Sequence, residues 1–160
     1  MKRKGVIITA AILIILLSGI CIIIATRNSK LSCYEYPIVD SMDAKQILSA
    51  CRIPEKTLNR MTDDALAQAV ADFPLLIDVT LASSIKDGVE CLADESDAYA
   101  ELLTRAEAKN VLIEKMKELY ESEDTQEYMK AVILRDVILN ESSFQDKLTE
   151  EEIAYLNSVN

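Results

Sequence analysis

Carboxylates are the most abundant kind of side chain in this sequence that could do chemistry. There are 27 Asp and Glu residues against 17 Lys and Arg, and there is no His. Histidine is the usual general base near neutral pH and supplies the imidazole of nucleophilic triads. Paired carboxylates can hydrolyse glycosides, but 27 acids produce such pairs throughout the chain by chance. The sequence also lacks a glycine-rich phosphate loop, an HExxH zinc motif and a GxSxG nucleophile motif, so we expect no enzyme and assign no catalytic residue.

The densest acidic cluster consists of Asp94, Glu95, Asp97 and Glu101, close to an expected helix start. Carboxylate oxygens at this spacing could bind Ca²⁺. The segment has neither the loop glycine nor the alternating Asp-x-Asp-x-Asp pattern of a calcium loop, and acidic residues are favoured at helix N-termini by the helix dipole. We therefore interpret the cluster as a solvated helix end and predict no metal site and no cofactor.

Three cysteines, Cys33, Cys51 and Cys91, follow the apolar N-terminal stretch. In an oxidising compartment an odd number is compatible with one disulfide and one free thiol. No CxxC pair supports a zinc or dithiol site. Because Cys51 falls on an apolar helical stripe, we interpret Cys51 and Cys91 as small buried apolar side chains.

Residues 6–25 contain no charge and follow a basic Lys-Arg-Lys run at 2–4. Twenty helical residues extend about 30 Å, the thickness of a bilayer core. The segment is either an uncleaved anchor or a cleavable signal with its best cut after Ala25. The bulky Ile23 occupies a position where a signal peptidase needs a small residue, so we favour a signal-anchor over residues 1–26.

The charges flanking this stretch predict its orientation. Basic residues 2–4 favour a cytoplasmic N-terminus, and Arg27 and Lys30 weaken the bias without reversing it. The predicted organisation is a linker over residues 27–40 and a single helical extracytoplasmic domain over residues 41–160. If the leader is cleaved, the same domain is secreted.

The part of the chain after the apolar stretch is strongly acidic. Residues 27–160 hold 14 basic and all 27 acidic residues, a net charge of −13. Nucleic-acid binding depends on neutralising phosphates, so we expect no nucleic-acid partner. The same charge should be repelled by anionic lipid headgroups and favours a basic partner.

The pattern after the linker predicts an all-α fold. Ala, Leu, Glu, Lys, Asp and Gln are abundant, and only one glycine, Gly88, follows the apolar stretch. In the first half we expect a helix capped by Asp40 or Ser41, a short helix from Pro54, and a helix capped by Thr62. The inner face of that third helix is predicted to consist of Leu66, Ala69, Val70 and Phe73.

The second half reads as a further series of helices. We expect one starting at Pro74, a turn at Asp87-Gly88, a short helix over 89–93 and one capped by Ser96. Longer helices are predicted over 104–120 and 126–140, followed by a last one capped by Thr149. The apolar set of 126–140 covers more than one stripe, so we predict that this helix is the most buried; its members are Met129, Val132, Ile133, Leu134, Val137 and Ile138.

One run of the sequence resembles uncharacterised exported proteins of clostridia and related Gram-positive bacteria. The matching positions are Ile53-Pro54-x-x-x-Leu58-x-x-Met61-Thr62-x-x-x-Leu66-x-x-Ala69-Val70-x-x-Phe73-Pro74-Leu75-Leu76 and, later, Glu101-Leu102-x-x-Arg105. The chain departs from that pattern at Phe73, where tyrosine is expected, and it lacks an aromatic-rich segment after Leu76. The resemblance implies a Gram-positive surface location and a helical fold, and it transfers no catalytic residue.

These features predict a membrane-tethered, extracytoplasmic interaction module at a Gram-positive cell surface. Residues 6–25 would hold it in the membrane, and the domain would bind a protein, a peptide or a cell-envelope component. The alternative is a secreted acidic inhibitor or immunity-type protein that masks a basic partner. Such binding would be sensitive to salt.

Overall fold

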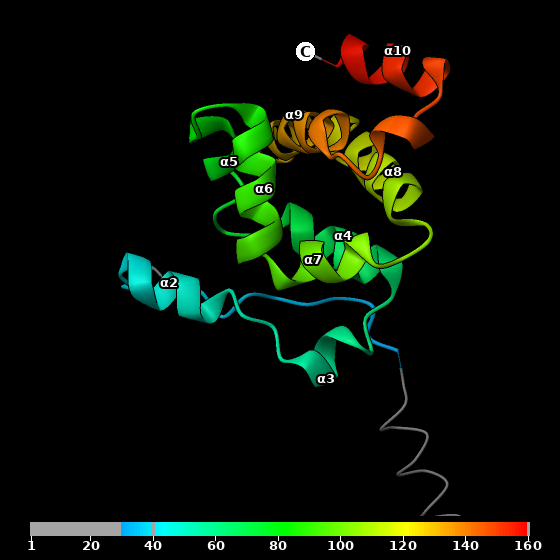
Figure 1. Cartoon of the computed structure of the whole chain (residues 1–160). Helices are drawn as coiled ribbons and strands as arrows, with labels where there is room; N and C mark the ends of the chain where they lie inside the picture. Colours follow the sequence, from blue (N-terminus) through cyan, green and yellow to red (C-terminus); the bar gives the residue numbers. More distant parts are fainter. Residues whose placement is uncertain (1–29, 40, 160) are drawn as a thin grey trace, which may run out of the picture. The chain divides into compact units, whose positions relative to one another are not determined.

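Helices account for nearly all the regular structure in the computed structural model, which describes residues 30–39 and 41–159 (Figure 1). Over that range there are nine α-helices, α2 to α10, and one short 3₁₀ helix. The one bridge between extended segments there joins Leu31 and Met61 in parallel. The prediction of an all-α, multi-helix domain is confirmed, and its compact unit comprises Leu31–Asn160.

The predicted anchor at residues 6–25 lies outside the described residues. Among the residues that are described, no helix has both the length and the apolar character needed to cross a membrane.

Helix α2 (Ala44–Ala50) begins with a capping box. The carboxylate of Asp43 accepts a hydrogen bond from the backbone N–H of Gln46 at 2.9 Å, and the Gln46 side chain accepts one from the N–H of Asp43 at 2.9 Å. The predicted caps, Asp40 and Ser41, are wrong. Asp43 is the acidic residue with a glutamine three positions later, and this spacing satisfies two otherwise unpaired amides at once.

Two further helices confirm the helix start expected at Pro54 and the cap expected at Thr62. Helix α3 (Glu55–Leu58) follows Pro54, and α4 (Asp63–Ala71) follows Thr62, whose hydroxyl accepts from the N–H of Ala65 at 3.1 Å. The residues predicted for its inner face are buried, but Phe73 lies two residues beyond the end of α4. Helix α4 packs against α7 and α8 and lies at the centre of the domain.

The extended segment 31–39 runs along α4 and the turn before it. The N–H of Leu31 donates to the carbonyl of Arg60 at 2.7 Å, and the N–H of Thr62 donates to the carbonyl of Leu31 at 3.0 Å. Further along, the Tyr36 hydroxyl donates to the carbonyl of Ala69 at 3.1 Å. Most of the segment assigned to the linker is therefore packed onto the domain.

The stretch after α4 differs in detail from the expected helices. Residues 74–77 form turns before the short helix α5 (Asp78–Leu81), so no helix starts at Pro74. The turn predicted at Asp87-Gly88 is also wrong, because both residues lie inside α6 (Ile85–Glu95). A Cβ atom on Gly88 would lie 2.3 Å from the carbonyl oxygen of Val79, so the glycine allows α5 and α6 to approach closely.

Helices α7 and α10 have the predicted caps, and α8 starts four residues later than predicted. Helix α7 (Asp97–Leu103) begins at Ser96, whose hydroxyl accepts from the N–H of Tyr99, and α8 (Ala108–Tyr120) follows a turn. Helix α9 (Thr125–Asn140) packs against α8. The 3₁₀ helix (Gln145–Lys147) leads to α10 (Glu150–Ser158), where Thr149 is the expected cap and forms a capping box with Glu152.

Burial is highest in α4 rather than in α9. Six of the nine residues of α4 are buried, against five of the sixteen residues of α9. The prediction that the 126–140 helix is the most buried is therefore wrong, and part of its apolar surface reaches solvent.

Candidate binding groove

An open groove of about 530 Å³ lies between the end of α4, the turn that follows it, and the N-terminal half of α9. Its base is apolar, and Asp72, Gln126 and Lys130 contribute polar groups. The full lining consists of Ala71, Asp72, Phe73, Pro74, Leu76, Ile77, Gln126, Met129, Lys130 and Ile133.

Two large apolar side chains of the groove are exposed. Ile77 is 41% exposed and Met129 is 51% exposed, whereas Phe73, Leu76 and Ile133 beneath them are 3–6% exposed. A groove with a buried apolar base and accessible apolar walls is suited to hold apolar side chains of another molecule. Methionine adapts to such contacts because its side chain is flexible and polarisable.

The local sequence explains why the turn after α4 presents Ile77. Pro74 disfavours a helical conformation at Phe73, which ends the continuation of α4. The chain then turns tightly, with the N–H of Leu76 donating to the carbonyl of Phe73 at 3.0 Å. As a result Leu76 points into the core and the next residue, Ile77, is exposed.

Capping by Asp124 fixes the start of the opposite wall. Its carboxylate accepts hydrogen bonds from the N–H groups of Gln126 at 2.6 Å and Glu127 at 3.4 Å. These bonds satisfy amides of the first turn of α9, which carries Gln126 and Met129.

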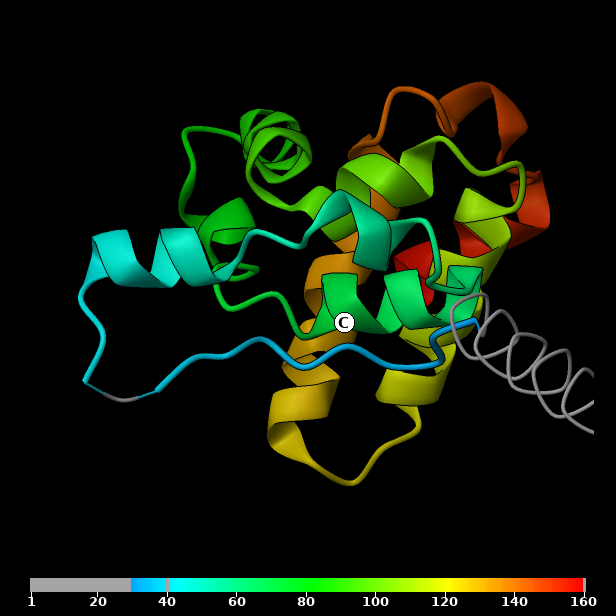
Figure 2. The ribbon, with the colours of Figure 1, turned by 90° about the horizontal axis from the view of Figure 1, so that it is seen from below.

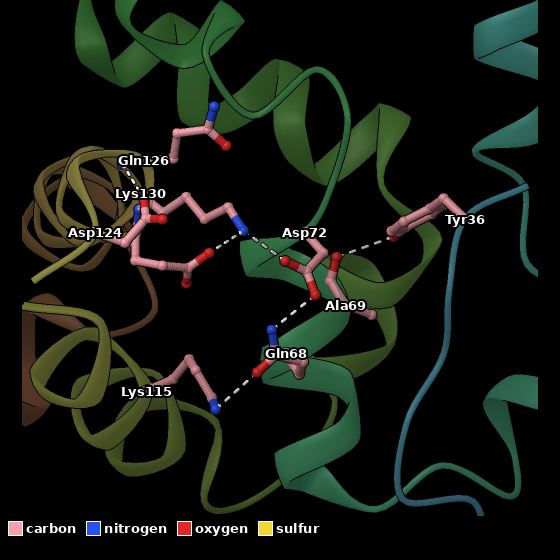
Figure 3. A network of polar contacts seen from close by, with 9 residues as sticks. Tyr36, Gln68, Ala69, Asp72, Lys115, Asp124, Gln126 and Lys130 are labelled. Atoms are coloured by element: carbon pink, nitrogen blue, oxygen red, sulfur yellow. Dashed lines mark hydrogen bonds and ion pairs between the residues drawn. The ribbon is translucent and has the colours of Figure 1, made fainter. Parts of the chain in front are cut away.

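A polar network holds α4, α8 and α9 together beside the groove (Figure 3). The ammonium of Lys130 donates to Asp72 at 2.7 Å and to Glu127 at 2.9 Å. Gln68 then donates to the other oxygen of Asp72 at 2.7 Å and accepts from Lys115 at 2.9 Å. The chain of contacts links two lysines through the polar face of α4.

The positive charge of Lys130 in this network is compensated by the carboxylates of Asp72 and Glu127. Partial burial by itself lowers the pKa of Lys130, but the carboxylates of Asp72 and Glu127 outweigh it and leave the pKa above its usual value. The lysine is therefore held as an ammonium ion and is not poised as a base or a nucleophile. The network supports the geometry of the groove rather than reaction chemistry.

The acidic residues singled out in the sequence do not converge on one site. Asp97 accepts from the guanidinium of Arg52 at 2.9 Å and from the N–H of Ile53 at 2.8 Å. Glu101 accepts from Arg105, four residues later, at 2.7 Å. Across the described part of the chain, no group of three or more Cys, Asp or Glu side chains is arranged to hold a metal ion.

The cysteines differ in their surroundings. Cys51 is buried, as predicted, and burial raises the pKa of its thiol. Cys91 is exposed, so its interpretation as a buried apolar residue is wrong, and Cys33 is exposed as well. These three thiols are free.

A second groove, of about 520 Å³, lies between α8 and α10. Most of the residues that line it are of polar type, and the ammonium of Lys117 lies 5.5 Å from the centre of the Tyr155 ring. In this groove Lys117 pairs with Glu114, and Glu152 pairs with Lys109 of α8. The groove beside α9 is the more apolar of the two and is the stronger candidate for binding.

Sequence reasoning missed this groove, although one signal was available. Met129 belongs to the apolar set of α9 that is too wide for a single buried stripe. An apolar set of this width is compatible with a deeply buried helix, as predicted above, and equally with an exposed apolar wall. No comparable signal marks Ile77, whose exposure results from the turn after Pro74.

The comparisons with known proteins add no assignment. No family model, curated protein or solved structure matches this chain. The resemblance to exported proteins of Gram-positive bacteria therefore remains a prediction.

Proposed function

We propose that this protein is a membrane-tethered, extracytoplasmic binding module whose groove beside α9 holds apolar side chains of a protein partner. The observation that carries the proposal is the exposure of Ile77 and Met129 over a buried apolar base. Solvent-exposed apolar residues grouped in a groove are a feature of interaction sites. The uncharged stretch at residues 6–25 supports tethering to the membrane, with the N-terminus in the cytoplasm.

The proposed mode of action is binding without catalysis. The sequence has no His, and the lysine at the groove is paired with two carboxylates. A partner would place an apolar side chain between Ile77 and Met129 and a polar group near Gln126 or the Asp72–Lys130 pair. Aliphatic and aromatic anchors in such pockets commonly supply most of the binding energy.

Site-specific photo-crosslinking in native cells tests this proposal. A benzophenone amino acid replaces Met129 in the groove or, as the control, Ile153 on α10, which is 37% exposed and lies outside the groove. We expect a discrete protein adduct from position 129 that is absent from position 153. The same adducts from both positions, or none from either, would count against the groove.

A second candidate function is supported by charge. Residues 63–160 contain eight basic and 23 acidic residues, which suits an acidic inhibitor that masks a basic partner. This alternative predicts that the bound fraction falls steeply between low and high salt. Binding through the apolar groove predicts a weak dependence on ionic strength.

A further inference from the structure

Charge is unevenly distributed along the part of the chain after the apolar stretch. Residues 27–62 contain six basic and four acidic residues, a net charge of +2. Residues 63–160 contain eight basic and 23 acidic residues, a net charge of −15. The overall negative charge therefore conceals a basic segment next to the proposed anchor.

The described part of this segment lies together on one side of the domain. The extended segment 31–39, α2 and α3 lie on one side and α10 lies on the opposite side, as both views show (Figure 1, Figure 2). We call the described residues 30–39 and 41–62 the basic layer. Arg52 in this layer pairs with Asp97 at 2.9 Å, and the acidic Glu35, Asp43 and Glu55 are exposed. The basic side chains are all exposed and outnumber these acids; they are Lys30, Lys45, Arg52, Lys56 and Arg60.

The basic layer also presents isolated apolar side chains. Val39 is 56% exposed and Leu48 is 44% exposed, and neither lines the groove beside α9. Basic side chains together with exposed apolar ones suit the headgroup region of an anionic bilayer. The acidic remainder of the domain is repelled by the same surface.

Chain length brings the basic layer to the bilayer, and this step rests on the proposed anchor. If residues 6–25 span the membrane, five residues, 26–30, separate the span from Leu31. At 3.3–3.6 Å per residue, Leu31 stays within roughly 20 Å of the hydrocarbon core. A tether this short gives the layer a high effective concentration at the headgroups, so a weak attraction is sufficient to orient it.

We propose that the basic layer is a lipid-binding surface that docks on anionic phospholipid headgroups and directs the acidic remainder of the domain away from the bilayer. The net charge of −13 on residues 27–160 predicts repulsion of the whole domain from an anionic bilayer, but under this proposal only the acidic remainder is repelled and the basic layer is attracted. Attraction at the layer and repulsion elsewhere both favour the same orientation.

The test uses the full chain in nanodiscs made of phosphatidylcholine alone or mixed with phosphatidylglycerol. A nitroxide on a fraction of the choline headgroups broadens the NMR signals of nearby backbone amides. With phosphatidylglycerol present, we expect several-fold stronger broadening for residues 41–60 than for residues 150–158. The difference should be much smaller in phosphatidylcholine alone.

A pair of matched variants separates local charge from net charge. K45E/K56E and K86E/K147E change the net charge equally, and all four lysines are exposed. We expect K45E/K56E to lose most of the effect of phosphatidylglycerol and K86E/K147E to retain it. Equal loss in both pairs, or a profile that ignores lipid charge, would overturn the proposal.

The two proposals fail in distinguishable ways. A chain that remains in both kinds of nanodisc at high salt but shows no lipid-dependent profile overturns the lipid-binding surface alone. A chain that high salt releases from both kinds contradicts the anchor, and the lipid-binding surface falls with it because it depends on the tether.

Discussion

Helices α4 and α9 are both rich in apolar residues, but they have different surroundings. In α4, alanines at positions 65, 67, 69 and 71 are buried, and their small size lets neighbouring helices pack closely on several sides. In α9, larger residues on one side fill the core while Met129 reaches solvent. In these two helices, apolar residues that cover more than one side have different roles. Where they are small, as in α4, the helix is buried at the centre of the domain, and where they are large, as in α9, one side can form the wall of a binding groove.

The largest expected contrast is between truncations in the two helices. Leu66 of α4 is fully buried, so Leu66→Ala should lower the free energy of unfolding by about 2–5 kcal/mol. Met129→Ala in α9 should change it by no more than about 0.5 kcal/mol. Denaturant unfolding of the full chain in detergent, followed by circular dichroism, measures both. Similar costs would refute the contrast.

Gly88→Ala tests the close packing of α5 against α6. Alanine usually stabilises a helix interior relative to glycine by about 1 kcal/mol. Here its Cβ would lie 2.3 Å from a backbone oxygen, so we expect a loss of about 1–3 kcal/mol. Adding Val79→Ala should not rescue the variant, because the atoms in conflict belong to the Val79 backbone. A stabilised G88A protein would disprove the close approach.

Loss of the N-terminal cap should accelerate amide exchange over a larger part of the domain for α4 than for α9. Thr62→Ala and Asp124→Ala should each cost about 1 kcal/mol. Because α4 is central, T62A should accelerate amide exchange across the domain, whereas D124A should accelerate it mainly in the first turns of α9. Mass-spectrometric hydrogen exchange on both variants compares the two patterns. Acceleration of amide exchange across the whole domain in D124A would contradict the predicted difference between α4 and α9.

The smallest expected effect is the pH dependence of the contact that joins α4 to α9. The pKa of Lys130 is raised in the folded protein, so its ion pair with Asp72 stabilises the fold below the ordinary lysine value of 10.5. That contribution is lost as the pH rises through the raised pKa. The stability difference between the native protein and Lys130→Met should therefore shrink above about pH 10.5. A stability difference that stays constant with pH would show that the ion pair between Lys130 and Asp72 does not contribute to the free energy of unfolding.

Local chemistry in the sequence predicted the caps at Thr62, Ser96 and Thr149, and the structure confirms all three. A cap depends on a side chain and amides within four residues, so it can be recognised without the fold. Asp43 was missed in favour of its neighbours because several polar residues there could serve as caps, and the position of Gln46 decides between them.

Features that depend on tertiary packing could not be read from the sequence. Gly88 is typical of a turn by residue type, and only the approach of Val79 explains its place inside a helix. The packing of residues 31–39 depends on partners such as Ala69, more than 30 positions away. The groove likewise joins the turn after Pro74 to a helix that begins some 50 residues later.

The central claim is that the groove beside α9 binds a partner, and the most direct test is the affinity of that partner for two matched variants. The partner is the protein captured by crosslinking from position 129. We expect Met129→Glu to weaken its binding at least tenfold, which corresponds to about 1.4 kcal/mol, and Ile153→Glu to leave it unchanged. Equal affinity of the native protein and M129E, or an equal loss in both variants, would contradict the account.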